Sequence, residues 1–376
     1  VTAAFSVGEI VAGLSAPFVG RAIDRIGARR AIGWGAIGIA ATFFVLARVE
    51  ALWQYFAAFA LQTFAATWAL FLPFQWLLAQ WFVRRRGLAI GIATAGFGLG
   101  GSVFLPLIAL VIARWGWRAA YQTSGVIMLG FFVPLAILLV RNRPRDLGLQ
   151  PDGDPEPPPD AVRPTGQGAR GTLGGLIRTP RFWALAGAQA LFFAPVASFG
   201  LHAVPFFESE GRTAAAGATI VAAAAITRTP LRVVAGWWLD RRLSLAWYGV
   251  GVCLLHAACL ALLLVSTGGP AVALFVAAWG VGGALGPLLF SLTSARTFGS
   301  TSFAMVSGSL FAVETVVAVV LPPLGGYLYD QQRSYVAAFS IYAVSLVLAA
   351  GAWAAFGLLR PAVPRDAGVE PEPARA

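Results

Sequence analysis

The sequence predicts an all-α membrane protein built from two similar helical halves. Hydrophobic residues make up 58% of the 376 residues, charged residues only 11%, and the mean hydropathy is +0.76. A soluble domain averages about 45–50% apolar and about 25% charged residues, so lipid must solvate most of this chain. A short pattern also occurs twice, each time where a long apolar segment gives way to charge. Repeated halves of this kind are typical of membrane transporters.

The repeated pattern is a glycine followed four residues later by an Asp-Arg pair. The first copy occupies residues 20–30 and the second residues 236–242. Two prolines repeat at the same offset, because Pro106 and Pro322 each lie 82 residues after the aspartate of their own copy. These matched positions indicate that the second half repeats the first.

Eleven segments are apolar and long enough to be predicted as membrane spans, which need about 20 residues to cross roughly 30 Å of hydrocarbon. They cover residues 2–20, 31–48, 52–82, 87–113, 119–140, 182–207, 213–238, 244–266, 270–295, 302–328 and 335–359. The first copy of the pattern follows one span of its half, whereas the second follows two. We therefore expect that a first span is missing, through truncation or a misplaced gene start.

Arginines gather in the loops 21–30, 84–86 and 241–242 and in the segment 141–181, whereas the intervening loops are weakly charged or mixed. The positive-inside rule therefore places these loops and the C-terminus in the cytoplasm. The domains that we expect are a five-span bundle over 1–140, a cytoplasmic linker over 141–181, a six-span bundle over 182–360 and a disordered cytoplasmic tail over 361–376. Proline and acidic residues at 151–159 indicate that the linker is extended and flexible.

The composition argues against a soluble enzyme and against a nucleic-acid-binding protein. The formal net charge of +11 comes from arginines in short loops between apolar segments, which is typical of cytoplasmic loops and not of a nucleic-acid surface. Cys253 and Cys259 lie within one apolar span, and their spacing matches no metal or redox motif. No phosphate loop, metal cluster or catalytic triad is present, so we expect no cofactor, no metal and no enzymatic activity.

Residues 96–101 satisfy the pattern Gly-x-Gly-x-x-Gly, but they lie inside the predicted span 87–113. A dinucleotide site needs a strand before this pattern and a soluble helix after it. Small residues four apart instead let helices approach closely in lipid. We therefore interpret these glycines, together with Gly87 and Gly91, as helix-packing residues.

Arg228 and Arg232 are the strongest candidates for a substrate site. With Asp240 taken as the cytoplasmic end, a rise of about 1.5 Å per residue puts Arg232 roughly 12 Å deep and Arg228 roughly 18 Å deep. An arginine at such a depth costs at least about 2.5–3.5 kcal/mol and usually faces a polar cavity or a partner. A carboxylate would bind the guanidinium through two parallel hydrogen bonds. The alternative is that one or both side chains reach the interface or pair structurally.

Three further titratable residues are candidates for proton coupling. Glu314 lies in the middle of span 302–328, and Glu9 lies roughly 18 Å from the charged end of the first span by the same rise per residue. A buried carboxyl group could load and release protons, or it could be paired with an arginine. His202 could titrate near neutral pH, or it could be a hydrogen-bonded structural residue at the outer end of its span.

The loop at 20–30 reads Gly-x-x-x-Asp-Arg-x-Gly-x-Arg-Arg and resembles the signature loop of the major facilitator superfamily. The resemblance covers the whole chain and implies a major-facilitator fold with two pseudo-symmetric bundles that rock around a midplane site. The second copy lacks the glycine after its Asp-Arg pair. The resemblance also implies that both loops form a conformational latch through ion pairs and helix ends. The latch residues are Gly20, Asp24, Arg25, Arg29, Arg30, Gly236, Asp240 and Arg241.

Within that superfamily, residues 81–91, 116–118 and 143–149 resemble the branch of monocarboxylate transporters and oxalate/formate exchangers. In that branch a substrate-binding arginine lies eight residues before the aspartate of the second loop, which is the position of Arg232. Animal members carry an aspartate where this chain has Arg228, so their coupling scheme does not transfer directly.

The resemblance implies a secondary active transporter for a small organic anion, a monocarboxylate, working by alternating access with a proton as a candidate partner. We expect a monomer in the inner membrane of a bacterium. Two alternatives remain open at this stage. An efflux carrier for drugs or amphipathic solutes would keep its activity without Arg232. A non-transporting membrane sensor would show no flux and would bind a partner through the segment 141–181.

Overall fold

The computed structural model describes residues 2–154, 175, 177–242, 244–298 and 303–359, and these residues form helices and no strand. The predicted all-α membrane architecture is therefore confirmed. Nine helical stretches in this part of the chain are long and apolar enough to cross a membrane. The exact number of spans stays a prediction.

The N-terminal half begins with helices that follow the predicted spans closely. They are α1 (Thr2–Ile26), α2 (Ala28–Leu46), α3 (Leu52–Ala69), α4 (Phe71–Trp81), α5 (Arg86–Ile127), the π-helical η1 (Met128–Phe132) and α6 (Val133–Leu139). The predicted span 52–82 is two helices, because Leu70 has non-helical dihedral angles, φ −100° and ψ −106°. Conversely, α5 covers one predicted span and part of the next, with the chain turning at Gly116, where φ is 80°.

The C-terminal half contains six long helices. They are α8 (Pro180–Ser209), α9 (Ala214–Asp240), α10 (Ala246–Val265), α11 (Gly269–Phe298), α12 (Phe303–Gln332) and α13 (Val336–Leu358). Threonine caps begin two of them, because Thr179 Oγ1 accepts from the Phe182 amide and Thr213 Oγ1 accepts from the Ala216 amide. A serine or threonine at this position satisfies one of the amides that every helix start leaves unpaired.

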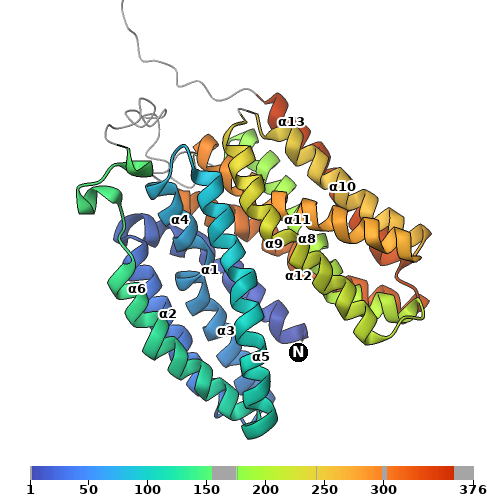
Figure 1. Cartoon of the computed structure of the whole chain (residues 1–376), viewed down its shortest axis with the longest axis horizontal. Coiled ribbons are helices and arrows are strands. Elements are labelled where there is room, and N and C mark those ends of the chain that lie inside the picture. Colours follow the sequence, from blue (N-terminus) through green and yellow to red (C-terminus); the bar gives the residue numbers. More distant parts are fainter. Residues whose placement is uncertain (1, 155–174, 176, 243, 299–302, 360–376) are drawn as a thin grey trace, which may run out of the picture.

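The two halves form two bundles, with α1–α6 in one and α8–α13 in the other (Figure 1). They contact each other mainly where α1 packs along α12 and where α5 packs along α9. The bundles lie close together at one end and diverge toward the other (Figure 1). Asp24 of α1 and Asp240 of α9 each bond to the first turn of a helix in the other bundle, and we call the end that carries them the Asp-Arg end.

The C-terminal bundle has an aromatic core. Phe199, Phe206 and Phe339 are 3% exposed or less and pack ring against ring, and Trp353 at 1% exposure closes the core toward the Asp-Arg end. A second cluster joins the two bundles, because it includes Ala16 and Ala31 of the N-terminal bundle together with Phe303 and Ala304 of α12. Large aromatic rings fill the interior of the C-terminal bundle, since protein interiors pack at crystal-like density.

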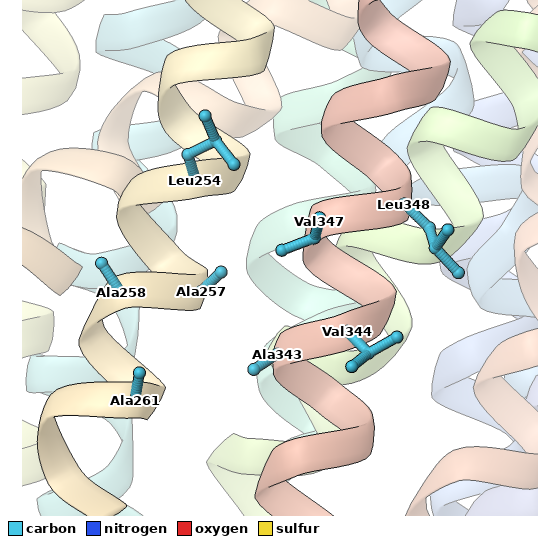
Figure 2. A pocket seen from close by; sticks show the side chains of 8 residues that line it. All are labelled: Leu254, Ala257, Ala258, Ala261, Ala343, Val344, Val347 and Leu348. Atoms are coloured by element: carbon cyan, nitrogen blue, oxygen red, sulfur yellow. The ribbon is translucent and has the colours of Figure 1, made fainter. Parts of the chain in front are cut away.

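A hollow of about 440 Å³ lies between α10 and α13, on the face of the C-terminal bundle away from α1 and α5 (Figure 2). Ala257 on α10 and Ala343 and Val347 on α13 point toward one another across it (Figure 2). All eight lining side chains are aliphatic. This hollow offers no group that could hold an anion and is not the candidate site.

Candidate functional site

The two arginines of α9 lie at the contact between the two bundles. Arg232 Nη1 donates to the main-chain oxygen of Thr94 on α5, at 2.8 Å. Its Nε is buried and has no hydrogen-bond partner in the described part of the chain. One bond to a carbonyl leaves most of the five guanidinium donors available and leaves the charge without a carboxylate partner.

Arg228 lies one helical turn further from the Asp-Arg end and is partly buried. Its side chain packs against Gly283 of α11, where an added Cβ would lie 3.1 Å from Arg228 Cδ. The two guanidinium groups are within electrostatic range of each other. Within the described residues, Arg84–Asp154 is the one ion pair, so no carboxylate compensates either arginine of α9. Two uncompensated cations on one helix repel, and an anion between them would relieve that repulsion.

Glu314 of α12 accepts a hydrogen bond at its Oε2 from Gln189 Nε2 of α8, at 2.8 Å. Gln189 itself is 9% exposed. Glu9 of α1 is partly buried, and the two carboxyl groups lie within electrostatic range across the contact between α1 and α12. The alternative expectation, that these acids pair with an arginine, has no counterpart among the described ion pairs.

The two histidines make contacts within the C-terminal bundle. His202 Nε2 lies 2.9 Å from the main-chain oxygen of Pro322, and its ring packs near Tyr335. His256 is fully buried, with Nδ1 3.0 Å from the Val252 oxygen of its own helix. Neither ring contacts Arg228 or Arg232 among the described hydrogen bonds, so the geometry gives His202 no link to the arginine pair.

The aspartate of the first loop caps a helix of the other bundle. Asp24 Oδ2 accepts from the amide of Met305 at 3.0 Å, and Oδ1 accepts from that of Ala304 at 3.3 Å. These amides belong to the first turn of α12, where a carboxylate satisfies unpaired donors and meets the positive end of the helix dipole. Such a cap contributes about 0.5–2 kcal/mol.

The aspartate of the second loop makes the reciprocal contact. Asp240 accepts from the amide of Gly87 at 2.6 Å and from that of Leu88 at 3.0 Å, in the first turn of α5. Arg296 on α11 lies within electrostatic range of Asp240 and holds the end of α9 by donating to the oxygens of Leu239 and Arg242. The pseudo-symmetry of the sequence is therefore also a pseudo-symmetry of contacts.

The glycine of each copy marks a backbone crossing between the bundles. A Cβ added at Gly20 would lie less than 3.0 Å from the main-chain oxygen of Ala304, and one added at Gly236 would lie equally close to that of Gly87. A main-chain oxygen cannot move aside as a flexible side chain can. The glycines are needed because any larger residue would hold the helices apart at the Asp-Arg end.

In the described ranges, the latch arginines do not form ion pairs with Asp24 or Asp240. Arg25 and Arg30 are exposed, Arg29 donates to the Ile137 oxygen of its own half, and Arg241 stacks on Trp237. Neither Asp24 nor Asp240 has an ion pair within 4.0 Å in the described part of the chain. The expected ion pairs are thus replaced by helix caps, which use main-chain amides.

Sequence reasoning missed a further contact between the bundles. Ser291 Oγ of α11 donates to Gln75 Oε1 of α4 at 2.5 Å, and both side chains are buried. A polar residue in an apolar span was the available signal, but its partner lies 216 residues away in the chain. The glycine prediction was correct at Gly87 and Gly91, which meet α9, and wrong at Gly96 and Gly100, where an added Cβ would meet nothing within 4 Å. The surroundings of Gly98 and Gly101 lie outside what the structure describes.

Two helical bundles joined by reciprocal helix caps, with two arginines at their contact that no described carboxylate pairs with, are the arrangement expected of a membrane carrier. The family model described as Major Facilitator Superfamily matches residues 1–320. The chain belongs to this superfamily and is an integral membrane transporter, which confirms the resemblance of the signature loop.

Named relatives agree with the branch indicated by the sequence. The chain is 28% identical over 364 residues to human monocarboxylate transporter 11, covering 91% of this chain and 73% of that one. It is 27% identical over 194 residues to the oxalate:formate antiporter of Oxalobacter formigenes, covering 49% and 41% of the two chains. The superfamily transporter FucP in its outward conformation matches with a TM-score of 0.69 at 14% identity, covering 94% and 88%.

Proposed function

We propose that this transporter moves a small organic anion, a monocarboxylate, by alternating access. The observation that carries the proposal is the state of Arg232, whose charge is partly buried between the bundles with one hydrogen bond and a buried, unpaired Nε. A carboxylate would accept from the free donors and neutralise the charge. The names of the relatives, monocarboxylate transporters among them, support the same substrate class.

Arg228 adds a second positive charge one turn away, with no carboxylate partner in the described residues. Its side chain packs against Gly283 of α11, and in this proposal it contacts the same substrate from there. Two cations attract an anion from water more strongly than one, and the binding of an anion lowers their mutual repulsion. In this proposal Arg232 holds the carboxylate and Arg228 assists.

The direction in which the site opens follows from the latch. The positive-inside rule assigns the Asp-Arg end, the segment 141–181 and the C-terminus to the cytoplasm. Both helix caps are formed at that end, and in this proposal the structure is the outward-facing state of the transporter. Release of the substrate to the cytoplasm requires both caps to break, and the proposed setting is a bacterial plasma membrane.

The experiment that tests the proposal is uptake into proteoliposomes. Labelled lactate, pyruvate and oxalate are supplied with an inward pH gradient, and the wild type is compared with Arg232→Ala. We expect uptake of the monocarboxylates by the wild type and loss of that uptake in the variant. A wild type that takes up none of these acids contradicts the proposal.

Glu314→Gln is expected to remove the dependence of uptake on the pH gradient while leaving exchange of internal for external substrate. The amide can still accept from Gln189, so the local structure is kept, but it cannot carry a proton. The measurement is the pH profile of net uptake and of exchange in proteoliposomes. Glu50→Gln, at an exposed loop position, is the matched control and should keep the wild-type profile. A wild-type profile for the Glu314 variant would exclude this residue as the proton carrier.

A further inference from the structure

We infer that residues 141–154, which follow α6, form a clasp that sets the strength of the latch between the two bundles. The sequence predicts a flexible linker here, but this segment is held in place. It contains two short helical turns, η2 (Pro144–Leu147) and η3 (Pro151–Gly153). It contacts the latch loop that carries Asp24 and the loop between α4 and α5, which precedes the amides that Asp240 accepts. The inference does not depend on the identity of the substrate.

The first contact of the clasp is at the loop between α4 and α5. The carboxylate of Asp152 accepts from the amides of Val83 at 3.0 Å, Arg84 at 2.9 Å and Arg85 at 3.2 Å. Three consecutive amides directed at one carboxylate form a strong, charge-assisted interaction. Arg84 also pairs with Asp154, at the exposed edge of the same contact.

The backbone of Asp152 adopts an unusual conformation at this contact. Its φ of 61° lies in the left-handed region, which few residues other than glycine adopt, and Gly153 follows with φ 73°. Such a conformation persists only where the surroundings hold it. The carboxylate that accepts the three amides supplies that restraint, so the turn and the contact depend on each other.

The contact matters because the next amides of the same loop belong to the latch. Gly87 and Leu88 donate to Asp240 of the other bundle, directly after the amides that Asp152 accepts. Arg86 ties the start of α5 to the end of α4 by donating to the main-chain oxygens of Phe82 and Ala79. The clasp therefore fixes the start of α5 from within its own bundle, and Asp240 meets amides that are already oriented.

The second contact of the clasp is at the loop that carries Asp24. Asn142 Oδ1 accepts from the amide of Arg29 at 2.9 Å, and the Asn142 side chain packs on Gly27, at the start of α2. Between the two contacts, Trp81 Nε1 donates to the oxygen of Arg141 at 3.0 Å. One segment thus holds both the loop that supplies Asp24 and the loop that receives Asp240.

The test measures opening of the Asp-Arg end directly, without transport. Ser291→Cys places a thiol in the buried contact with Gln75, where a membrane-impermeant maleimide reaches it from the cytoplasmic side when the bundles part. Cys253 and Cys259 are 1% and 2% exposed, and the parent without the new thiol gives the background. Labelling rates are measured for the full chain in inside-out membrane vesicles.

In the S291C background, D152A is expected to raise the labelling rate about three- to tenfold, which lies within the range of about two- to thirtyfold that corresponds to the coupling changes of residues acting through another site. The control D154A removes only the exposed pair with Arg84 and should change the rate less than about twofold. D240N should also raise the rate, and D152A should add little on the D240N background, because Asp152 is inferred to act through the contact of Asp240 with Gly87 and Leu88.

Labelling of D152A at the parental rate would overturn the inference, and so would effects of D152A and D240N that multiply. If D152A does not accumulate in the membrane, N142A compared with D24N provides the same test at the other loop. N142A labelling at the parental rate would then overturn the inference. The labelling assay does not measure transport. Its outcome therefore does not depend on whether the protein transports a monocarboxylate.

Discussion

Arg232→Ala is expected to lower kcat/KM for monocarboxylate uptake by about a hundredfold or more. The substitution removes a two-pronged, charge-assisted contact, and each hydrogen bond to a charged group contributes about 1.5–3 kcal/mol. A loss of about 2.7 kcal/mol corresponds to a factor of about one hundred. The measurement is the initial rate of labelled lactate or pyruvate uptake into proteoliposomes over a range of concentrations.

Three variants make this result specific. Arg232→Lys keeps the charge but not the planar fork, so an intermediate loss is expected. Arg228→Ala should weaken uptake less than Arg232→Ala, because it removes the assisting charge. Arg114→Ala, at an exposed position on α5, should behave as wild type. Wild-type uptake by Arg232→Ala, in protein that elutes from size-exclusion chromatography as the wild type does, would refute substrate binding by this residue.

The positions of the helices could be predicted from the sequence because each span is a long apolar run bounded by charge. The positions at which a helix is interrupted within such an apolar run were harder to predict. Leu70 interrupts an apolar segment, and Pro73 contributes to the interruption because it has no amide hydrogen to donate to the Ala69 oxygen. The apolar pattern by itself did not place the break at Leu70. At Gly116 the residue type did signal the turn between two predicted spans, and the structure has φ 80° there.

The candidate site could be predicted in part. Depth along one helix depends only on the rise per residue, so Arg228 and Arg232 could be located from Asp240. Their neighbours could not, because Thr94 lies 138 residues from Arg232 in the chain and contributes a main-chain oxygen that has no sequence signal.

The segment 151–154 shows where composition misleads. Proline, glycine and acidic residues together predict an extended, solvated chain, because they cannot build an apolar core. Asp152 instead stabilises its turn by accepting three main-chain amides from another loop. Composition measures the capacity to bury apolar surface, whereas this segment is held by polar contacts.

Gly236→Ala is expected to hold the bundles apart at the Asp-Arg end and to lower uptake about five- to 150-fold. The added Cβ would overlap the main-chain oxygen of Gly87, so α9 must move away from α5 and Asp240 must leave its amides. Overpacking of this kind costs about 1–3 kcal/mol. Here that cost falls on the latched state, because the overlap disappears when the bundles part, so the population shifts toward the inward-facing state.

The matched control is Gly251→Ala on α10, where an added Cβ meets nothing within 4 Å. It should transport as the wild type does. Gly20→Ala should reproduce the effect of Gly236→Ala, because Gly20 meets the Ala304 oxygen in the reciprocal crossing. Faster maleimide labelling at Ser291→Cys in both variants would show that the Asp-Arg end has opened. Wild-type uptake and labelling in Gly236→Ala would show instead that the repeated glycine is not required for the close approach of the two bundles.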